Sequence, residues 1–71
     1  MDYTNDELTE AKRQIDSTIY KLNGVIGTLE AKEEPARYRS QLTLARRRVK
    51  AFSLASELIS RELERRMNGA G

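Results

Sequence analysis

The sequence has 71 residues, of which 13 are Lys or Arg and 11 are Asp or Glu, and its formal net charge is +2. This length suits one small domain, and the absence of Cys and His excludes disulfide bonds, thiolate nucleophiles, sulfur-ligated zinc and the usual general base. No apolar run approaches the roughly 20 residues of a transmembrane helix. The acidic, polar N-terminus is unlike a secretory signal. We therefore expect a cytoplasmic protein without a metal, a cofactor, a membrane partner or a small-molecule substrate.

The first predicted element is a helix that begins at residues 4–5. Thr4 and Glu7 have the spacing of a capping box, in which each side chain bonds to the backbone amide of the other residue. Tyr3 and Leu8 occupy the two positions of a hydrophobic staple around this start. These two signals are independent, and they agree on where the helix begins.

Apolar residues repeat at helical spacing from this start to about residue 32. Three rows are expected to share one face and to span an arc of roughly 100°. The rows are Leu8, Ile15, Leu22 and Leu29; Ala11, Thr18 and Val25; and Ile19 and Ile26. The pattern predicts an amphipathic first helix over about 5–32 with a narrow apolar face.

Gly24 and Gly27 interrupt this pattern, and each costs about 1 kcal/mol relative to Ala inside a helix. The apolar phase nevertheless continues through them, and both glycines fall on the back of the helix. We therefore expect a continuous helix, straight or bent, in preference to a break at 23–27. We interpret the glycines as tolerated weak points rather than as places where another backbone approaches closely.

The segment 32–35 predicts a short turn. Pro35 lacks an amide proton and suits the first position of a helix, and it disfavours helical backbone at Glu34. So short a connection makes the two flanking helices antiparallel neighbours.

The second helix is expected over about 35–67, with Asn68-Gly69 as its stop and 69–71 as a flexible tail. Its main stripe alternates spacings of four and three. The stripe consists of Tyr38, Leu42, Ala45, Val49, Phe52, Ser56, Ile59 and Leu63. A second row lies beside it and consists of Leu44, Ala51, Ala55 and Leu58. The fold class is therefore all-α, a single antiparallel helical hairpin.

The second row predicts an oligomer. The first helix cannot cover it, and soluble monomers avoid contiguous exposed apolar patches. We expect the second helices of two copies to pack through Leu44, Ala51, Ala55 and Leu58, giving a homodimeric four-helix bundle. A stable partner protein, a trimer or a tetramer would also cover the row.

The charge is divided unevenly, because residues 1–34 have a net charge of −4 and residues 35–71 have +6. We expect pairs across the hairpin at both ends. The open end would join Asp6, Glu7 and Glu10 to Arg61, Arg65 and Arg66, and the turn end would join Glu30 and Glu33 to Arg37 and Arg39. The run 46–50 has no acidic residue opposite it and predicts an unpaired basic belt.

The basic outer face of the second helix is a candidate contact for nucleic acid or for an acidic protein surface. It is formed by Arg39, Arg46, Arg47 and Lys50. No helix-turn-helix, RNP motif or basic zipper accompanies it, so the signal has low specificity.

No catalytic constellation is visible in the sequence. Ser56 lies on the apolar stripe without a nearby base, and we expect its hydroxyl to bond to the carbonyl of Phe52. Thr18 is expected to bond to its own helix in the same way. The sequence therefore predicts a non-enzymatic interaction or structural module that acts as a hairpin homodimer. The alternative is an accessory nucleic-acid-binding protein.

Overall fold

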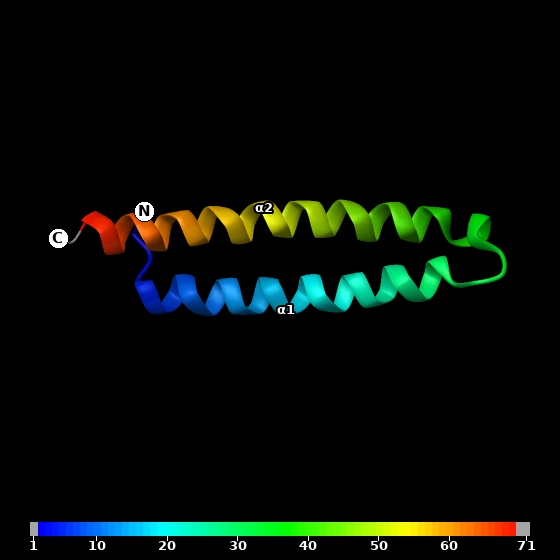
Figure 1. Ribbon diagram of the computed structural model, residues 1–71, viewed down its shortest axis with the longest axis horizontal. Coiled ribbons are helices and arrows are strands. Elements are labelled where there is room, and N and C mark those ends of the chain that lie inside the picture. The colour runs from blue at the N-terminus through cyan, green and yellow to red at the C-terminus, as the bar shows by residue number, and fades with distance from the viewer. Residues whose placement is uncertain (1, 70–71) are drawn as a thin grey trace.

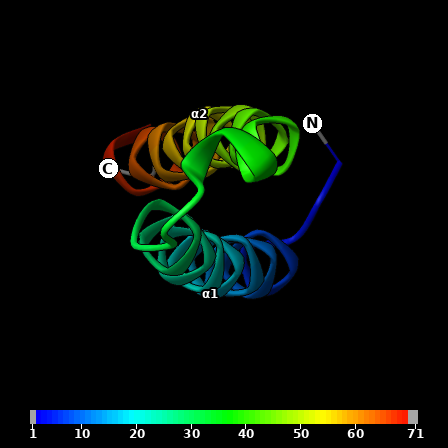
Figure 2. The ribbon, with the colours of Figure 1, turned by 90° about the vertical axis from the view of Figure 1, so that its right-hand side faces the viewer.

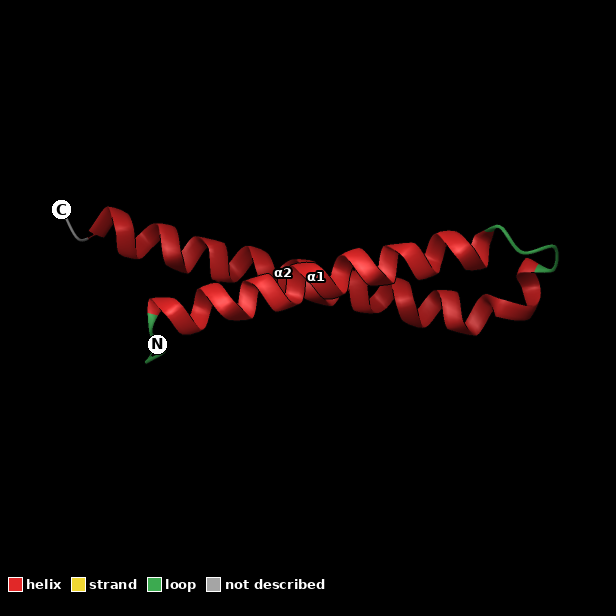
Figure 3. Cartoon of the chain, turned by 90° about the horizontal axis from the view of Figure 1, so that it is seen from below, coloured by secondary structure: helices red, strands yellow, loops and turns green. Residues whose placement is uncertain are grey.

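The computed structural model describes residues 2–69, which form a rod of 55 × 17 × 14 Å. Helix α1 spans Asn5–Glu30, a 3₁₀ turn η1 spans Pro35–Tyr38, and helix α2 spans Arg39–Gly69. The two long helices run antiparallel and side by side, with the turn at one end and both termini at the other (Figure 1). Seen from the turn end they form two adjacent cylinders (Figure 2), and seen from below they cross near their middles (Figure 3). The predicted all-α hairpin is confirmed.

The capping box at the start of α1 is present as predicted. The Glu7 amide donates to Thr4 Oγ1 at 3.0 Å, and the Thr4 amide donates to Glu7 Oε1 at 3.0 Å. Hydrogen bonding to the backbone and side chain of Thr4 holds the pKa of the Glu7 carboxyl below its ordinary value. Tyr3 and Leu8 line one shallow hollow at this end, but Tyr3 is 59% exposed, so the hydrophobic staple stays a prediction. Local side-chain chemistry therefore fixes where α1 begins.

Helix α1 continues through both glycines. Neither Gly24 nor Gly27 has a positive φ, and a Cβ added at either position would meet no atom within 4 Å. The helix ends at Glu30, two residues before the expected end, and the Ala31 amide donates to the carbonyl of Gly27 at 3.2 Å. The expectation of a continuous helix is confirmed, and the open space around both positions agrees with tolerated weak points.

The predicted start of the second helix needs a correction. Residues 35–38 form a 3₁₀ turn, and α2 begins at Arg39. The backbone at Glu34 has φ −121° and ψ 73°, outside the helical region that a following proline disfavours. The Arg37 amide then donates to the Glu34 carbonyl at 3.1 Å, a bond that spans three residues instead of four. The proline therefore starts a tighter turn before the α-helix.

The predicted end of the second helix is also corrected. Helix α2 extends to Gly69, two residues beyond the expected end at residue 67, and Gly69 has no positive φ. The rest of the expected tail, residues 70–71, lies outside the described residues.

The main stripe of α2 faces α1 as predicted. Every member is buried or half-buried, and Leu42, Ala45 and Ser56 are the most buried. On α1, Leu8 is buried. Two rows of α1 lie at the interface, one formed by Leu8, Ile15, Leu22 and Leu29 and the other by Lys12, Ile19 and Ile26. These positions also alternate spacings of four and three, as in an antiparallel coiled coil.

One of the three rows predicted for the face of α1 is wrong. Ala11, Thr18 and Val25 are exposed, Val25 by 48%. The interface keeps the other two predicted rows, and Lys12 extends the row of Ile19 and Ile26. A single line of contact between two helices accommodates two rows from each, which leaves out the third. Ala11, Thr18 and Val25 consequently lie along one edge of the interface.

Replacing Gly24 and Gly27 by Ala is expected to stabilise the hairpin by up to about 1 kcal/mol per position. Alanine is the better helix former, and neither site has a neighbour that a methyl group would strike. Thermal and urea unfolding followed by circular dichroism would measure the gain. Gly69→Ala, at the last residue of α2, is the control and should change stability far less. Loss of stability in either interior variant would contradict this account.

Candidate interaction surfaces

A polar cluster crosses the interface at its middle. Lys12 and Asp16, one turn apart on α1, meet Ser56 on α2. The Ser56 hydroxyl donates to Asp16 Oδ1 at 2.6 Å and accepts from Lys12 Nζ at 3.0 Å, and Lys12 Nζ also donates to Asp16 Oδ2 at 2.7 Å. Ser56 itself is only 7% exposed. Its hydroxyl is therefore satisfied by charged groups across the interface.

This cluster overturns the expected bond from Ser56 to the Phe52 carbonyl. A carboxylate is a stronger acceptor than a backbone carbonyl, because its hydrogen bond is charge-assisted. Thr18, which has no such group opposite it, does donate to the carbonyl of Gln14 at 2.9 Å, as predicted. The sequence contained one usable signal, since a serine on an apolar stripe requires a polar partner on the facing helix.

The chemistry of the cluster favours a structural role over a nucleophilic one. Hydrogen bonds from Lys12 and Ser56 hold the pKa of the Asp16 carboxyl below its ordinary value, which makes it a weak base. The Lys12 ammonium is committed as a donor to both partners and has no lone pair with which to accept the serine proton. The three groups align the helices and offer no activated hydroxyl.

A second polar contact closes the same edge nearer the turn, where Arg46 on α2 forms an ion pair with Glu30 on α1. Arg46 was expected to be unpaired and Glu30 to pair with Arg37 or Arg39, so both expectations are corrected. Arg37 lies in the 3₁₀ turn and Arg39 is the first residue of α2, so both are near the bend of the chain. Arg46 lies two turns further along α2 and is the arginine that pairs with Glu30.

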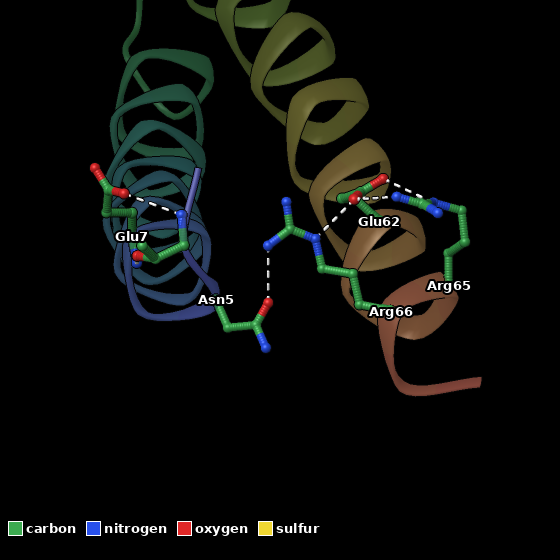
Figure 4. A network of polar contacts seen from close by, with 6 residues as sticks. Asn5, Glu7, Glu62, Arg65 and Arg66 are labelled. Carbon is green, nitrogen blue, oxygen red and sulfur yellow. Dashed lines mark hydrogen bonds and ion pairs between the residues drawn. The ribbon is translucent and has the colours of Figure 1, made fainter. Parts of the chain in front are cut away.

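The ion pairs predicted at the open end do not form as expected. Glu10 pairs with Arg13 on its own helix, and Glu62 accepts from Arg65 at 2.6 Å and from Arg66 at 2.7 Å (Figure 4). Residues three and four apart on one helix are close neighbours, so these arginines pair with acidic residues on their own helix. The contact that crosses the helices here runs from Arg66 to the side-chain oxygen of Asn5, at 2.8 Å (Figure 4).

The opposite edge of the interface is mainly apolar, although Arg48 and Glu62 of α2 border it. At about 100° per residue, Ala11 and Lys12 flank the contact line of α1 on its two sides, so the row of Ala11, Thr18 and Val25 faces away from the polar cluster. Two shallow hollows open on this edge between the helices. One is lined by Tyr3, Glu7, Leu8, Ala11 and Ile59, and the other by Gln14, Ile15, Thr18 and Phe52.

The second row of α2 borders this same edge. By the same helical geometry, Leu44, Ala51, Ala55 and Leu58 lie on the flank of α2 opposite Arg46. Leu44 is 49% exposed and Leu58 is 56% exposed, Ala51 is exposed, and Ala55 is half-buried. We call this surface the open face. It comprises Ala11, Thr18 and Val25 from α1 and Leu44, Ala51, Ala55 and Leu58 from α2.

Unpaired basic side chains gather on the turn half of α2. Residues 35–56 contain six basic residues and no acidic one. Within residues 2–69, Arg46 has an acidic partner, whereas none is found for Arg39, Arg47, Arg48 or Lys50. Arg39 and Arg46 line a shallow hollow together with Thr43. The structure thus retains three of the four predicted basic contacts as free cations and gives the fourth, Arg46, a partner.

Other classes of site receive no positive signal. Across the described part of the chain, no three acidic side chains gather closely enough to hold a metal ion. Neither described α-helix combines the length and the apolar character needed to cross a bilayer. No protein family model, no curated protein and no solved structure matches the sequence or the fold. The surfaces themselves are therefore the basis for any functional conclusion.

Glu62→Gln is expected to weaken the acid sensitivity of the hairpin. Hydrogen bonds from Arg65 and Arg66 lower the pKa of the Glu62 carboxyl from 4.5 to about 2. A lowered folded-state pKa contributes stability that is complete above the ordinary value and is lost as the pH falls through the folded value. The native thermal midpoint should therefore fall between pH 4.5 and about 2, and it should fall less in the variant.

Circular dichroism across this pH range would measure both midpoints. Glu64→Gln is the matched control, since Glu64 is exposed and forms no ion pair among the described residues. Equal acid sensitivity in the native protein and in Glu62→Gln would contradict the assignment.

Proposed function

We propose that the chain is a non-enzymatic interaction module that acts as a homodimer of helical hairpins, joined through the open face into a four-helix bundle. The observation that supports this proposal is the contrast between the two edges of the interface. Polar contacts at Lys12, Asp16, Ser56, Glu30 and Arg46 cross one edge, whereas the other edge has two mainly apolar hollows beside half-covered leucines.

A second copy is the partner that fits this surface most directly. A two-fold interface requires one patch that complements itself, and an apolar patch meets this condition. Ala11, Ala51 and Ala55 have small side chains, which allow two helices to approach closely. No side chain among residues 2–69 is completely sealed from solvent in the single hairpin, so dimerisation would also complete the core.

The double variant Leu44→Gln, Leu58→Gln tests the proposed dimer. It removes four partly exposed leucines from the dimer interface, which should cost about 3 kcal/mol or more and raise the dissociation constant roughly a hundredfold. Glutamine keeps the net charge and the helix propensity unchanged. Light scattering over a concentration series would measure the dissociation constant.

Tyr20→Gln is the control, because Tyr20 is 81% exposed and lies on the outer side of α1. It should leave the dimer intact. A native protein that is folded and monomeric at micromolar concentration would overturn the proposal. A native trimer or tetramer would replace the dimer with a higher assembly, and a monomer that folds only with another protein would assign the open face to a foreign partner.

The unpaired cations support a second candidate function, which is contact with nucleic-acid phosphates. Arg39, Arg47 and Lys50 project from the outer side of α2 without acidic partners among the described residues, and Arg46 borders them. At about 100° per residue Arg39 lies away from the open face, whereas Arg47 and Lys50 line a shallow hollow with Ala51. A dimer would therefore leave Arg39 accessible and place Arg47 and Lys50 at its rim. Electrostatic contact of this kind would be independent of sequence.

Titration with duplex DNA and duplex RNA at two salt concentrations tests this candidate. Replacing Arg39, Arg47 and Lys50 by Gln should lower the affinity and reduce the slope of log affinity against log salt by about 0.9 for each phosphate that the variant no longer neutralises. The control replaces Arg13, Lys21 and Lys32, which removes the same formal charge from elsewhere. Absent binding at low salt, or an equal decrease in affinity in both variants, would reject it. The cytoplasmic location stays a prediction.

A further inference from the structure

We infer that the two hairpins of the dimer lie head to tail, with the α2 helices of the two copies antiparallel and crossing near Ala51. This inference rests on the proposed homodimer and specifies its geometry. Two arrangements would bury the open face symmetrically. In the head-to-tail arrangement α2 packs on the second copy's α2, and in the head-to-head arrangement, whose two-fold axis runs along the rod, α2 packs on the second copy's α1.

The distribution of charge along the rod favours the head-to-tail arrangement. The open half, residues 2–16 and 53–69, has eight acidic and five basic residues, a net charge of −3. The turn half, residues 17–52, has eight basic and three acidic residues, a net charge of +5. Head to tail, each negative half faces a positive half. Head to head, like charges face each other along the whole interface, which is unfavourable.

The apolar row of α2 points to the same arrangement. Leu44 and Leu58 each lie seven residues from Ala51, so the row reads nearly the same in both directions. An antiparallel crossing near Ala51 places Leu44 of each copy close to Leu58 of the other. Ala51 and Ala55 then lie at the crossing, where the helix axes approach most closely and small side chains are needed.

Arg48 adds to this distribution of charge at the border of the open face. It borders the open face in the turn half and has no acidic partner among residues 2–69. Glu62 borders the same flank of α2 in the open half. In the head-to-tail arrangement Arg48 of each copy lies about 12 Å along the axis from Glu62 of the other copy, which is attractive without being a direct contact. The head-to-head arrangement separates α2 from α2.

Cysteine cross-linking of the full chain tests the orientation directly, because the chain has no cysteine of its own. Ala51→Cys should form covalent dimers with a short bis-maleimide linker. Ser53→Cys, two residues away on the opposite flank of α2, is the matched control and should form at least tenfold less. Comparable yields for the two variants would overturn the inference.

Leu44→Cys and Leu58→Cys then fix the direction. A mixture of the two variants should cross-link, but neither variant should cross-link alone, because the two copies of one position would lie about 21 Å apart along the axis at 1.5 Å per residue. Self-cross-linking of Leu44→Cys would indicate parallel α2 helices and overturn the inference. An absence of cross-links at all three positions would indicate that α2 packs on the second copy's α1, and it would also overturn the inference.

Light scattering on each variant separates this inference from the proposed function. A dimer with the wrong cross-links contradicts the orientation alone, whereas a native monomer contradicts both.

Discussion

A single line of contact between two helices governs the whole molecule. Two rows of each helix fit into such a line when their spacing alternates between four and three residues. Residues that flank this line of contact lie at one of its two edges. The two edges of this hairpin differ chemically because residues adjacent in the sequence fall on opposite sides of the line. Lys12 takes the side where Ser56 and Asp16 meet it, and Ala11 takes the other. One edge is therefore crossed by polar contacts, and the other is mainly apolar.

The parts of the fold that depend on local chemistry could be predicted from the sequence. The capping box at Thr4 and Glu7 and the apolar period of each helix involve residues within a few positions of one another. The choice between the row of Ala11 and the row of Lys12 could not be made in this way. Both rows flank Leu8. Ile19 and Ile26 favour the row of Lys12, but a lysine looks unfavourable in an apolar pattern, and its place is explained by the serine on the facing helix.

The same distinction explains the errors in the polar contacts. Acidic and basic residues that face each other across a hairpin look complementary on paper, yet neighbours on one helix reach each other at lower entropic cost. Arg65 and Arg66 therefore pair with Glu62 on their own helix instead of with acidic residues of α1. Glu30 pairs with Arg46 across the interface, at the point where its own helix ends. The second row of α2, from Leu44 to Leu58, could be identified from its periodicity alone, because no other element of the hairpin packs against it.

The Lys12, Asp16 and Ser56 cluster has a further consequence for the alignment of the rod. A repeat of seven residues is degenerate, since sliding one helix by seven positions restores most of its apolar contacts. Such a slide would bring Val49 or Leu63 to the place of Ser56. Lys12 would keep Asp16 as its acceptor on α1, but Lys12 and Asp16 would both lose their hydrogen bonds to the hydroxyl across the interface and would face hydrocarbon there. The Ser56 hydroxyl, near the middle of the rod, therefore makes the shifted alignments less stable than the observed one. It favours a single register of α1 against α2.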